Sequence, residues 1–437
     1  MNIFVSGIGG AGMGPLAEVA HQIGYQVAGS DKQNSSYIDY LKKHGISDIH
    51  IHQTVENIAR VHRKTPIDWL VYSSAVTLEN PKPPELEFAR KHGIRVSKRD
   101  ELLNFILNEK KLDMIAIAGT HGKTTTTAMM VFLLQELGQS ISYLLPAKTS
   151  FADMGKYNQQ SRWFIYEADE FDRNFLAFHP KISLISGVAY DHHEIFLTRD
   201  DYKAAFREFI DQSTRTFIWR ADAEYLELGD NVSIRMLDDD RQVDQITLFG
   251  RYNRRDAWLV AEVVHEMTSE PLDKLLEILA KFPGLSRRME QIAPNLYSDY
   301  AHTPEKIVGA MSVAREMAAE GGRRLIVIYE PLTNRRQHYI LDDYRDAFSG
   351  ADKLYWLPSY LAREPEGLRI IPPAELIEHL DHETEKIAEP AKMGDVLKEK
   401  IDEHLRHGDM VVAMTGGGGN SLDTWLRDGW QNRDYLT

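Results

Sequence analysis

The stretch MIAIAGTHGKT, residues 114–124, decides the fold of the middle of the chain. Its apolar residues predict a buried strand, Met114–Ala118, and the glycine loop that follows leads into a threonine-rich, apolar helix over Thr125–Leu134. Glycines let a backbone wrap a phosphate, amides at a helix N-terminus donate to it, and the Lys123 ammonium would neutralise the β- and γ-oxygens. The usual phosphate loop has another glycine six residues before its lysine, where this chain has Ile117. The motif is therefore a shortened phosphate loop; the alternative is a glycine turn with a surface lysine.

Strand and helix signals alternate on both sides of this loop, in three blocks. Such alternation predicts α/β domains with mostly parallel sheets covered by helices. We expect domains over residues 1–110, 111–284 and 285–437, divided by a polar linker at Asn108–Asp113 and the breaker pair Pro283-Gly284. Residues Thr216–Thr247 contain short strand signals and little helix, and predict a small β-patch. The strands expected outside the central block are Asn2–Ser6, Gln26–Gly29, Trp69–Tyr72, Leu296–Tyr300, Leu325–Tyr329, Lys353–Leu357 and Met410–Met414.

Composition excludes several classes of protein. The 437 residues are 43% hydrophobic and 27% charged, which is the balance of a globular chain and argues against disorder. A net charge of −14 argues against a generic nucleic-acid partner. Cysteine is absent, so disulfides, thiol catalysis and zinc thiolates are excluded. No apolar run approaches the roughly 20 residues of a membrane span, and the chain opens directly into a strand pattern. A cytoplasmic enzyme without membrane insertion is expected.

A second glycine loop lies at the start of the chain. Residues 7–12, GIGGAG, fit the pattern G-x-G-x-x-G directly after a predicted strand. Asp31 follows about 20 residues later, where a Rossmann site places the acid that binds ribose. Taken alone, the pattern predicts an NAD-dependent oxidoreductase, and an ordinary strand-to-helix turn is the alternative.

Acidic and imidazole side chains follow two strands of the central block. Trp163–Tyr166 is followed by the run EADE at 167–170, and Ile182–Gly187 is followed by DHHE at 191–194. Carboxylates at the carboxyl ends of parallel strands beside a phosphate loop are where Mg²⁺ is held. A neighbouring histidine would complete the metal site or contact the γ-phosphate. The alternative is a set of solvated loop residues.

Taken together, the motifs resemble the Mur ligases, the ATP-dependent amide-bond-forming enzymes of peptidoglycan precursor synthesis. The resemblance covers essentially the whole length. The matching segments, in the order of the family, are Gly119–Thr127 (GTHGKTTTT), Glu167–Asp169, Asp191-His192, Gly250–Asn253, Arg287-Arg288 and Asp299–His302. It implies a Rossmann-like UDP-sugar domain, a central phosphate-loop ATPase domain and a C-terminal Rossmann-like domain.

The resemblance also implies roles for individual residues. Lys123, His192 and Arg336 would be catalytic, and Thr124, Glu167 and His192 would hold Mg²⁺. The ATP-binding residues would be Gly119, Thr120, His121, Gly122, Lys123, Thr124, Thr125, Asn253, Arg288, Asp299 and His302. The UDP-sugar-binding residues would be Gly9, Gly10, Ala11, Gly12, Met13, Ser30, Asp31, Ser73 and Ser74.

The amine substrate is the open point of the resemblance. The opening loop and GGGN at 417–420 are similar to the members that join L-alanine to UDP-N-acetylmuramate. EADEFD at 167–172 and DHHEIF at 191–196 are similar to the members that attach a whole tripeptide to the same acceptor. Ligation of L-alanine is expected, with the tripeptide as the alternative. Of the two family arginines after the third-domain strand only Arg336 is kept, and it would bind the carboxylate of the amine substrate.

Phe206 stands where later-acting members carry a carbamylated lysine, so no carbamate is expected here. An NAD-dependent oxidoreductase would leave Gly119–Thr124 without a role. A non-catalytic nucleotide switch would not explain Glu167, His192 and Arg336 together. The sequence leaves the oligomeric state open.

Overall fold

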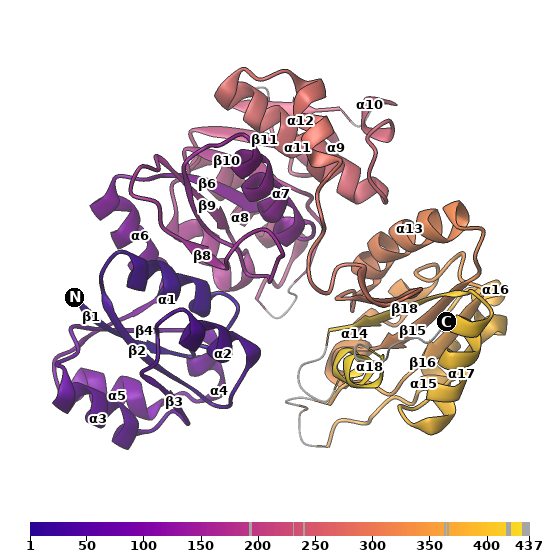
Figure 1. Cartoon of the computed structure of the whole chain (residues 1–437), viewed down its shortest axis with the longest axis horizontal. Coiled ribbons are helices and arrows are strands. Elements are labelled where there is room, and N and C mark those ends of the chain that lie inside the picture. Colours follow the sequence, from indigo (N-terminus) through magenta and orange to yellow (C-terminus); the bar gives the residue numbers. More distant parts are fainter. Residues whose placement is uncertain are drawn as a thin grey trace. The chain divides into compact units, whose positions relative to one another are not determined.

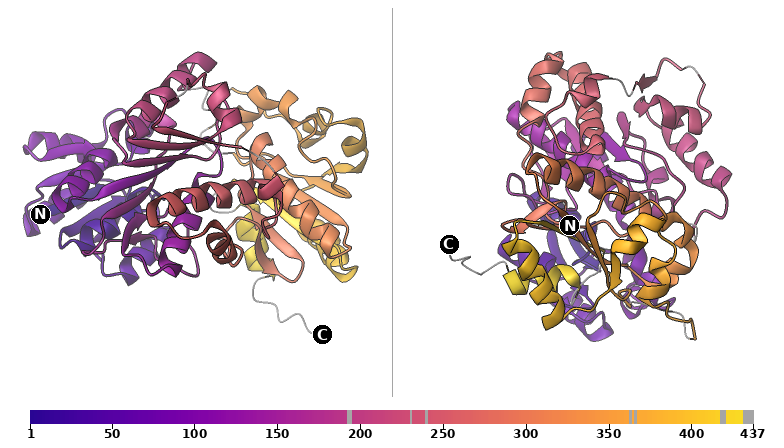
Figure 2. Two further views of the ribbon diagram at one scale, coloured as in Figure 1. Left: turned by 90° about the horizontal axis from the view of Figure 1, so that it is seen from above. Right: turned by 90° about the vertical axis from the view of Figure 1, so that its right-hand side faces the viewer.

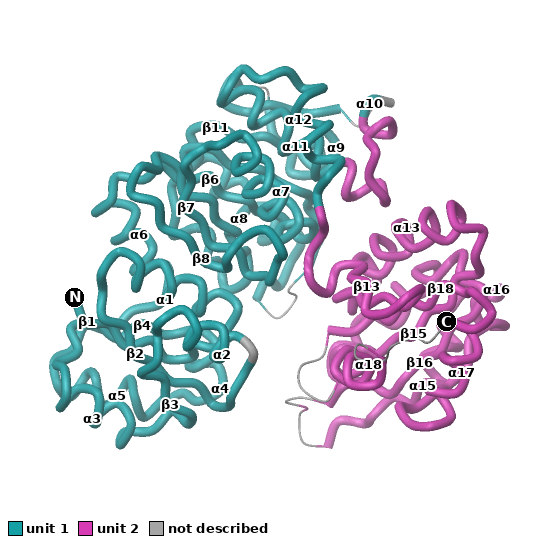
Figure 3. The backbone as a smooth tube through the Cα atoms, viewed as in Figure 1, with its two compact units in different colours: residues 1–242, 255–282 teal, residues 243–254, 283–437 magenta. Residues whose placement is uncertain are grey.

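The computed structural model describes residues 1–191, 195–229, 231–238, 241–361, 364, 367–416 and 421–430. The chain forms two compact units (Figure 3): unit 1 is residues 1–242 and 255–282, and unit 2 is residues 243–254 and 283–437. Unit 1 contains two sheets and unit 2 contains one. None of the helices in the described ranges is long and apolar enough to cross a membrane.

The first sheet has the strand order β3-β2-β1-β4-β5, and all its pairings are parallel. Its elements are β1 (Asn2–Ser6), α1 (Met13–Gln22), β2 (Gln26–Asp31), α2 (Ser36–Lys43), β3 (Ile49–Ile51), α3 (Val55–Lys64), β4 (Trp69–Tyr72), α4 (Ser74–Glu79), α5 (Pro84–Lys91), β5 (Arg95–Lys98) and α6 (Arg99–Lys110). Alternate residues of β1 enter different apolar layers, because successive side chains of a strand point to opposite faces. Helices α1, α2 and α6 cover one face, and α3 and α5 cover the other (Figure 1). The strand order reverses beside β1, so the first glycine loop leaves the sheet at its switch point.

The second sheet has the order β12-β11-β10-β6-β9-β7-β8 and is parallel except for β8. Its elements are β6 (Asp113–Ala118), α7 (Lys123–Glu136), β7 (Ile141–Leu144), β8 (Gly155–Lys156), β9 (Trp163–Glu167), η1 (Phe171–Ala177), β10 (Ile182–Ile185), α8 (Arg199–Asp211), β11 (Arg215–Trp219), α9 (Arg220–Tyr225), β12 (Ile234–Leu237), α10 (Arg241–Asp244), α11 (Arg251–Thr268) and α12 (Leu272–Leu279). Strand β6 lies between β10 and β9, so the phosphate loop also leaves its sheet at a switch point. Helix α7 is buried over Thr126–Leu134, as expected for a helix that is apolar on nearly all sides.

Two expectations about this region are wrong. The polar stretch Asn108–Asp113 is not a linker over its length: α6 runs to Lys110 and β6 begins at Asp113. Lys111, with φ 54°, ends the helix in the left-handed conformation. The segment Thr216–Thr247 is not a separate β-patch, because β11 and β12 extend the central sheet in parallel and α9 and α10 lie between and after them. Short strand signals do not reveal which sheet a strand joins.

The sheet of unit 2 has the order β13-β14-β18-β15-β16-β17, and only the β13–β14 pairing is antiparallel. Its elements are β13 (Glu290–Ala293), β14 (Leu296–Asp299), α13 (Pro304–Glu320), β15 (Leu325–Glu330), α14 (Asn334–Ile340), η2 (Asp342–Tyr344), β16 (Lys353–Trp356), α15 (Pro373–Ile377), α16 (His382–Ile387), β17 (Ala388–Pro390), α17 (Asp395–Arg406), β18 (Met410–Thr415) and α18 (Leu422–Trp430). Helices flank this sheet (Figure 2), and buried apolar residues of α13 and α15 belong to one layer while those of α17 and α18 belong to another. The α/β class and the parallel-dominated sheets expected from the sequence are confirmed.

Candidate active site

The phosphate loop is pressed against the segment that follows β10. Gly119 has φ 142° and Gly122 has φ 79°, conformations that side chains rarely adopt. A Cβ on Gly119 would lie 2.9 Å from the carbonyl oxygen of Gly187, so the backbones are too close for any other residue. The amide of Thr120 donates to that carbonyl at 2.8 Å. The segment after β10 therefore holds the loop in place at the carboxyl edge of the sheet.

Lys123 lies at the first position of α7, beside acidic side chains. Its ammonium donates to a carboxylate oxygen of Glu170 at 2.7 Å and to the carbonyl oxygen of Gly119. Burial lowers the pKa of Lys123, but the carboxylates of Glu170, Asp169 and Glu167 outweigh burial and raise it overall. The lysine is therefore a fixed positive charge at the end of the loop. The role of Glu170, which is fully buried, was not recognised from the sequence, although it belongs to the acidic run after β9.

The donors at this edge fit a magnesium ion. Thr124 presents a half-buried hydroxyl in the first turn of α7, and Glu167 is the last residue of β9. Hydroxyl and carboxylate oxygens are hard ligands of the kind that Mg²⁺ prefers. No group of three or more metal-ligating side chains occurs among the residues that the structure describes. The predicted ligand His192 lies outside the described residues.

Two further side chains, those of Tyr202 and Asp256, lie against the phosphate loop. The Thr120 hydroxyl hydrogen-bonds the Tyr202 hydroxyl at 2.7 Å and the carbonyl oxygen of Ala189 at 2.7 Å. Asp256, on α11, has an oxygen 2.9 Å from the position that a Cβ of Gly122 would take. Burial raises the pKa of Asp256 to about 8, against a hydrogen bond from Thr126. Sequence reasoning missed Tyr202 and Asp256; the one signal for Asp256 is its place a turn after Asn253.

The first glycine loop is braced by the ends of the neighbouring strands. The amides of Gly7 and Ile8 donate to the carbonyl oxygen of Ser30 at 2.8 and 3.0 Å. The Asp31 carboxylate accepts from the amide of Gly9 at 2.8 Å, and burial raises its pKa. Gly12 is the N-cap of α1 and has no side chain to cap the helix. The amides of Met13 and Gly14 donate to the carbonyl oxygen of Gly10, so the amides of Ala11 and Gly12 would be the donors for an anion.

The other predicted UDP-sugar residues lie at the same edge of the first sheet. The amide of Ser73, which follows β4, donates to the carbonyl oxygen of Ser6 at the end of β1, at 3.2 Å. Ser73 is the N-cap of α4, and Ser74 is the first residue of that helix. The structure therefore brings Gly9–Met13, Ser30-Asp31 and Ser73-Ser74 together.

Predicted nucleotide residues in unit 2 gather at the carboxyl end of β14. Asp299 accepts hydrogen bonds from the amides of Met289 and Ala301, both at 2.8 Å, and burial raises its pKa against Arg288. His302 hydrogen-bonds the Tyr300 carbonyl oxygen through Nδ1 at 2.7 Å. Burial, helped by Lys306 and Arg336, holds the pKa of His302 well below its ordinary value, so the ring is neutral at pH 7.

Tyr300 is half-buried and faces two arginines. The guanidinium carbons of Arg287 and Arg288 lie 4.6 and 5.4 Å from its ring centroid. Asn253, also in unit 2, donates its side-chain amide to the carbonyl oxygen of Phe249 at 2.8 Å. The predicted GGGN segment at 417–420 lies outside the described residues.

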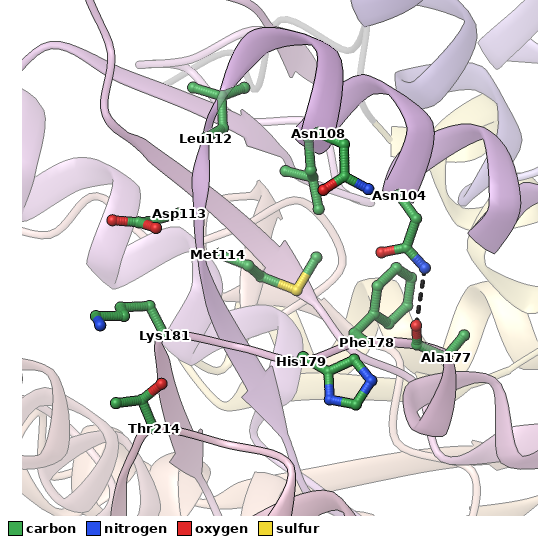
Figure 4. Close-up of a pocket in the computed structure, with 11 residues that line it drawn as sticks. Asn104, Asn108, Leu112, Asp113, Met114, Ala177, Phe178, His179, Lys181 and Thr214 are labelled. Atoms are coloured by element: carbon green, nitrogen blue, oxygen red, sulfur yellow. Dashed lines mark hydrogen bonds between the residues drawn. The ribbon is translucent and has the colours of Figure 1, made fainter.

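A cavity of about 380 Å³ lies at the opposite edge of the central sheet (Figure 4). Its lining includes Asp113 and Met114 at the start of β6 and Lys181 just before β10. Asn104 reaches from α6 and donates to the carbonyl oxygen of Ala177 at 2.8 Å. Parallel strands place their functional loops at the carboxyl edge, so this cavity is not part of the candidate active site.

Family models match all three blocks of the chain. They are described as Mur ligase family, catalytic domain, over residues 3–111; Mur ligase middle domain, over 117–238; and Mur ligase, glutamate ligase domain, over 287–417. A UDP-N-acetylmuramate–L-alanine ligase of Fusobacterium nucleatum is 30% identical, and the match covers 87% of each chain. One of Symbiobacterium thermophilum is 30% identical over 94% of this chain and 91% of its own.

Solved structures share the fold. The UDP-N-acetylmuramate-alanine ligase of Thermotoga maritima matches with a TM-score of 0.75 at 21% identity, over 98% of both chains. A murein peptide ligase of Psychrobacter arcticus matches with a TM-score of 0.65 at 20% identity, over the full length of both. Fold, phosphate loop and family matches define an ATP-dependent, amide-bond-forming ligase. The chain belongs to the Mur ligase family.

Proposed function

We propose that this enzyme joins L-alanine to UDP-N-acetylmuramate at the expense of ATP, in the synthesis of peptidoglycan precursors in the cytoplasm. The observation that carries the proposal is the pairing, within one chain, of a braced phosphate loop holding Lys123 with a glycine loop suited to a diphosphate. L-alanine is favoured over the tripeptide because the relatives at 30% identity are named L-alanine ligases. The oxidoreductase alternative is not favoured.

The three domains divide the substrates between them. Residues 1–110 would bind the UDP-sugar, residues 111–284 ATP, and residues 285–437 the amino acid and part of the nucleotide. The diphosphate would lie on Gly9–Met13, with Ser30, Asp31, Ser73 and Ser74 around it. Binding groups that lie on separate domains would require closure on the substrates before reaction.

The phosphate loop acts on the γ-phosphate. When ATP binds, the Lys123 ammonium would exchange its hydrogen bond with Glu170 for one with the β/γ-oxygens. Thr124 and Glu167, with His192, would hold Mg²⁺, which when bound neutralises charge that develops on the transferred phosphoryl group. The other amides of Gly119–Gly122 would donate to the phosphates, while the hydrogen bond from the Thr120 amide to Gly187 keeps the loop preorganised.

Ligation would take place in two steps. A carboxylate oxygen of the muramyl group attacks the γ-phosphorus, and the bond from that phosphorus to the bridging oxygen breaks. The products are an acyl phosphate and ADP. The amine of L-alanine then attacks the acyl carbon, loses a proton, and expels inorganic phosphate. Catalysis here is chiefly positioning and charge neutralisation. From unit 2, Arg336 would clamp the L-alanine carboxylate, while Asn253, Arg288, Asp299 and His302 would contact the nucleotide.

A panel of amines tests the proposal. L-alanine, L-serine, glycine and the murein tripeptide are each supplied with UDP-N-acetylmuramate, ATP and Mg²⁺, and phosphate release is followed. L-alanine should give the highest kcat/KM, and omission of either the amine or the acceptor should abolish release. A higher kcat/KM for the tripeptide would move the assignment to that substrate. Phosphate release without an acceptor would overturn the ligase assignment.

A further inference from the structure

Arg99 lies on the first glycine loop, although it belongs to another part of the first domain. It is the first residue of α6, directly after β5. A Cβ built on Gly12 would collide with Nη1 of Arg99, so the guanidinium rests against the loop at the N-cap of α1. Any side chain at position 12 would therefore have to displace the Arg99 guanidinium from this place.

The other side of the same guanidinium faces the acidic end of β9. Its Nη2 is 3.8 Å from a carboxylate oxygen of Asp169, and 22% of the side chain is exposed. Tyr166, Asp169 and Glu167 raise the pKa of Arg99 despite its burial. Arg99 thus lies between the first glycine loop and the acids that face Lys123.

The guanidinium is poorly satisfied where it lies. It carries five N–H donors, yet none of the described residues accepts a hydrogen bond from it, and 3.8 Å to Asp169 is too long for one. The side chain is partly exposed, so its unused donors can reach a ligand, and a planar guanidinium matches phosphate oxygens two at a time. The position and the unused donors both indicate an anionic ligand on the loop.

We propose that the guanidinium of Arg99, which lies against Gly12, binds the diphosphate of the UDP-sugar together with the amides of the glycine loop. The proposal rests on the proposed function, because that function supplies the diphosphate. A diphosphate held by Arg99 is also held beside Asp169 and Glu167, where the acceptor must meet the γ-phosphate. A lysine could not replace the arginine fully, since a point charge makes no paired hydrogen bonds.

Calorimetry on the full chain tests this inference, with UDP and ADP as probes and no second substrate. Arg99→Ala should weaken UDP binding about 10- to 100-fold, the range for loss of charge-assisted hydrogen bonds, and Arg99→Lys should weaken it less. ADP affinity should not change in either variant, which also reports that the central domain is folded. Should Arg99→Ala fail to fold, the Arg99→Lys variant alone decides the question.

Lys98→Ala is the matched control for a structural role. Lys98 lies next to Arg99 and makes the neighbouring contact to the central domain, with Nζ 2.6 Å from a carboxylate oxygen of Asp172. The control should keep the affinity for UDP. If Lys98→Ala weakens UDP binding as much as Arg99→Ala, Arg99 only holds the domains together, and the inference is overturned. Wild-type affinity for UDP in both Arg99 variants overturns it too, while failure of the wild-type enzyme to bind UDP overturns the proposed function with it.

Discussion

Replacing Asp256 by asparagine tests the protonation state of the carboxyl group that lies against Gly122 of the phosphate loop. Asp256 is 4% exposed, and its two oxygens lie 2.9 and 3.0 Å from where a Cβ of Gly122 would stand. Burial raises its pKa from an ordinary 3.8 to about 8, although Thr126 and Arg255 oppose the shift. Asparagine has nearly the same shape and cannot ionise, so Asp256→Asn removes the titration and keeps the packing.

The sign and size of the effect follow from proton linkage. In the unfolded chain this carboxyl loses its proton above pH 3.8, whereas in the folded protein it keeps the proton up to about pH 8. Between these values the folded state binds the extra proton, so the free energy of unfolding falls by about 1.4 kcal/mol per pH unit on account of this group. The variant lacks this slope. The free energy of unfolding of the variant, relative to that of the wild type, should therefore rise by about 2 kcal/mol from pH 6 to pH 8.

Urea unfolding at pH 6, 7 and 8 measures this difference. Trp219 and Trp258, both buried in the central domain, report its transition by fluorescence, with other tryptophans replaced where transitions overlap. Asp273→Asn, at an exposed position of α12, is the control and should shift the curves equally at every pH. A constant difference between Asp256→Asn and wild type over this range would refute the argument, because the carboxyl would then be ionised throughout.

Three further changes test the catalytic assignments. Lys123→Ala should still fold, because the buried residues of α7 that pack the domain are unchanged. The kcat for phosphate release should nevertheless fall by at least about 100-fold, because the cation at the γ-phosphate is lost. Near-normal turnover would contradict the assignment of the loop. Arg336→Ala should raise the KM for L-alanine about 10-fold or more while the KM for ATP stays within about 2-fold, with Arg335→Ala as control; the opposite pattern assigns Arg336 to the nucleotide. Removing CO₂ and bicarbonate should leave activity unchanged, because Phe206 is fully buried, with its ring centroid 5.1 Å from that of Tyr202, and offers no metal ligand. A loss of activity that bicarbonate restores would disprove this.

The elements around both glycine loops were predictable because their signals are contiguous. Strands β1 and β4 have the predicted bounds, and β6 differs from its prediction by one residue. A short apolar run that ends in glycines leaves the chain few options besides a strand followed by a tight turn. The helix predicted to begin at Thr125 begins two residues earlier, at Lys123, so its existence but not its first residue could be inferred from the sequence.

The electrostatic setting of the site could not be inferred in this way. Glu170 pairs with Lys123 across 47 residues of sequence, and Asp256 reaches the loop from a helix more than a hundred residues later. Burial, which raises the pKa of Asp256, depends on everything packed around it and not on its neighbours in the chain. Arg99 reads in the sequence as an ordinary charged residue at a helix start.

The amino-acid sequence by itself determined the class of this protein, the two glycine loops and the family to which it belongs. Local patterns encode where the chain turns and which side of an element is apolar, because these depend on neighbouring residues. Only the tertiary structure decided that β11 and β12 extend the central sheet, that the Arg99 guanidinium lies against Gly12, and that the Asp256 carboxyl group lies against Gly122. Such choices depend on which distant surfaces bury each other best, and that competition involves the whole chain at once.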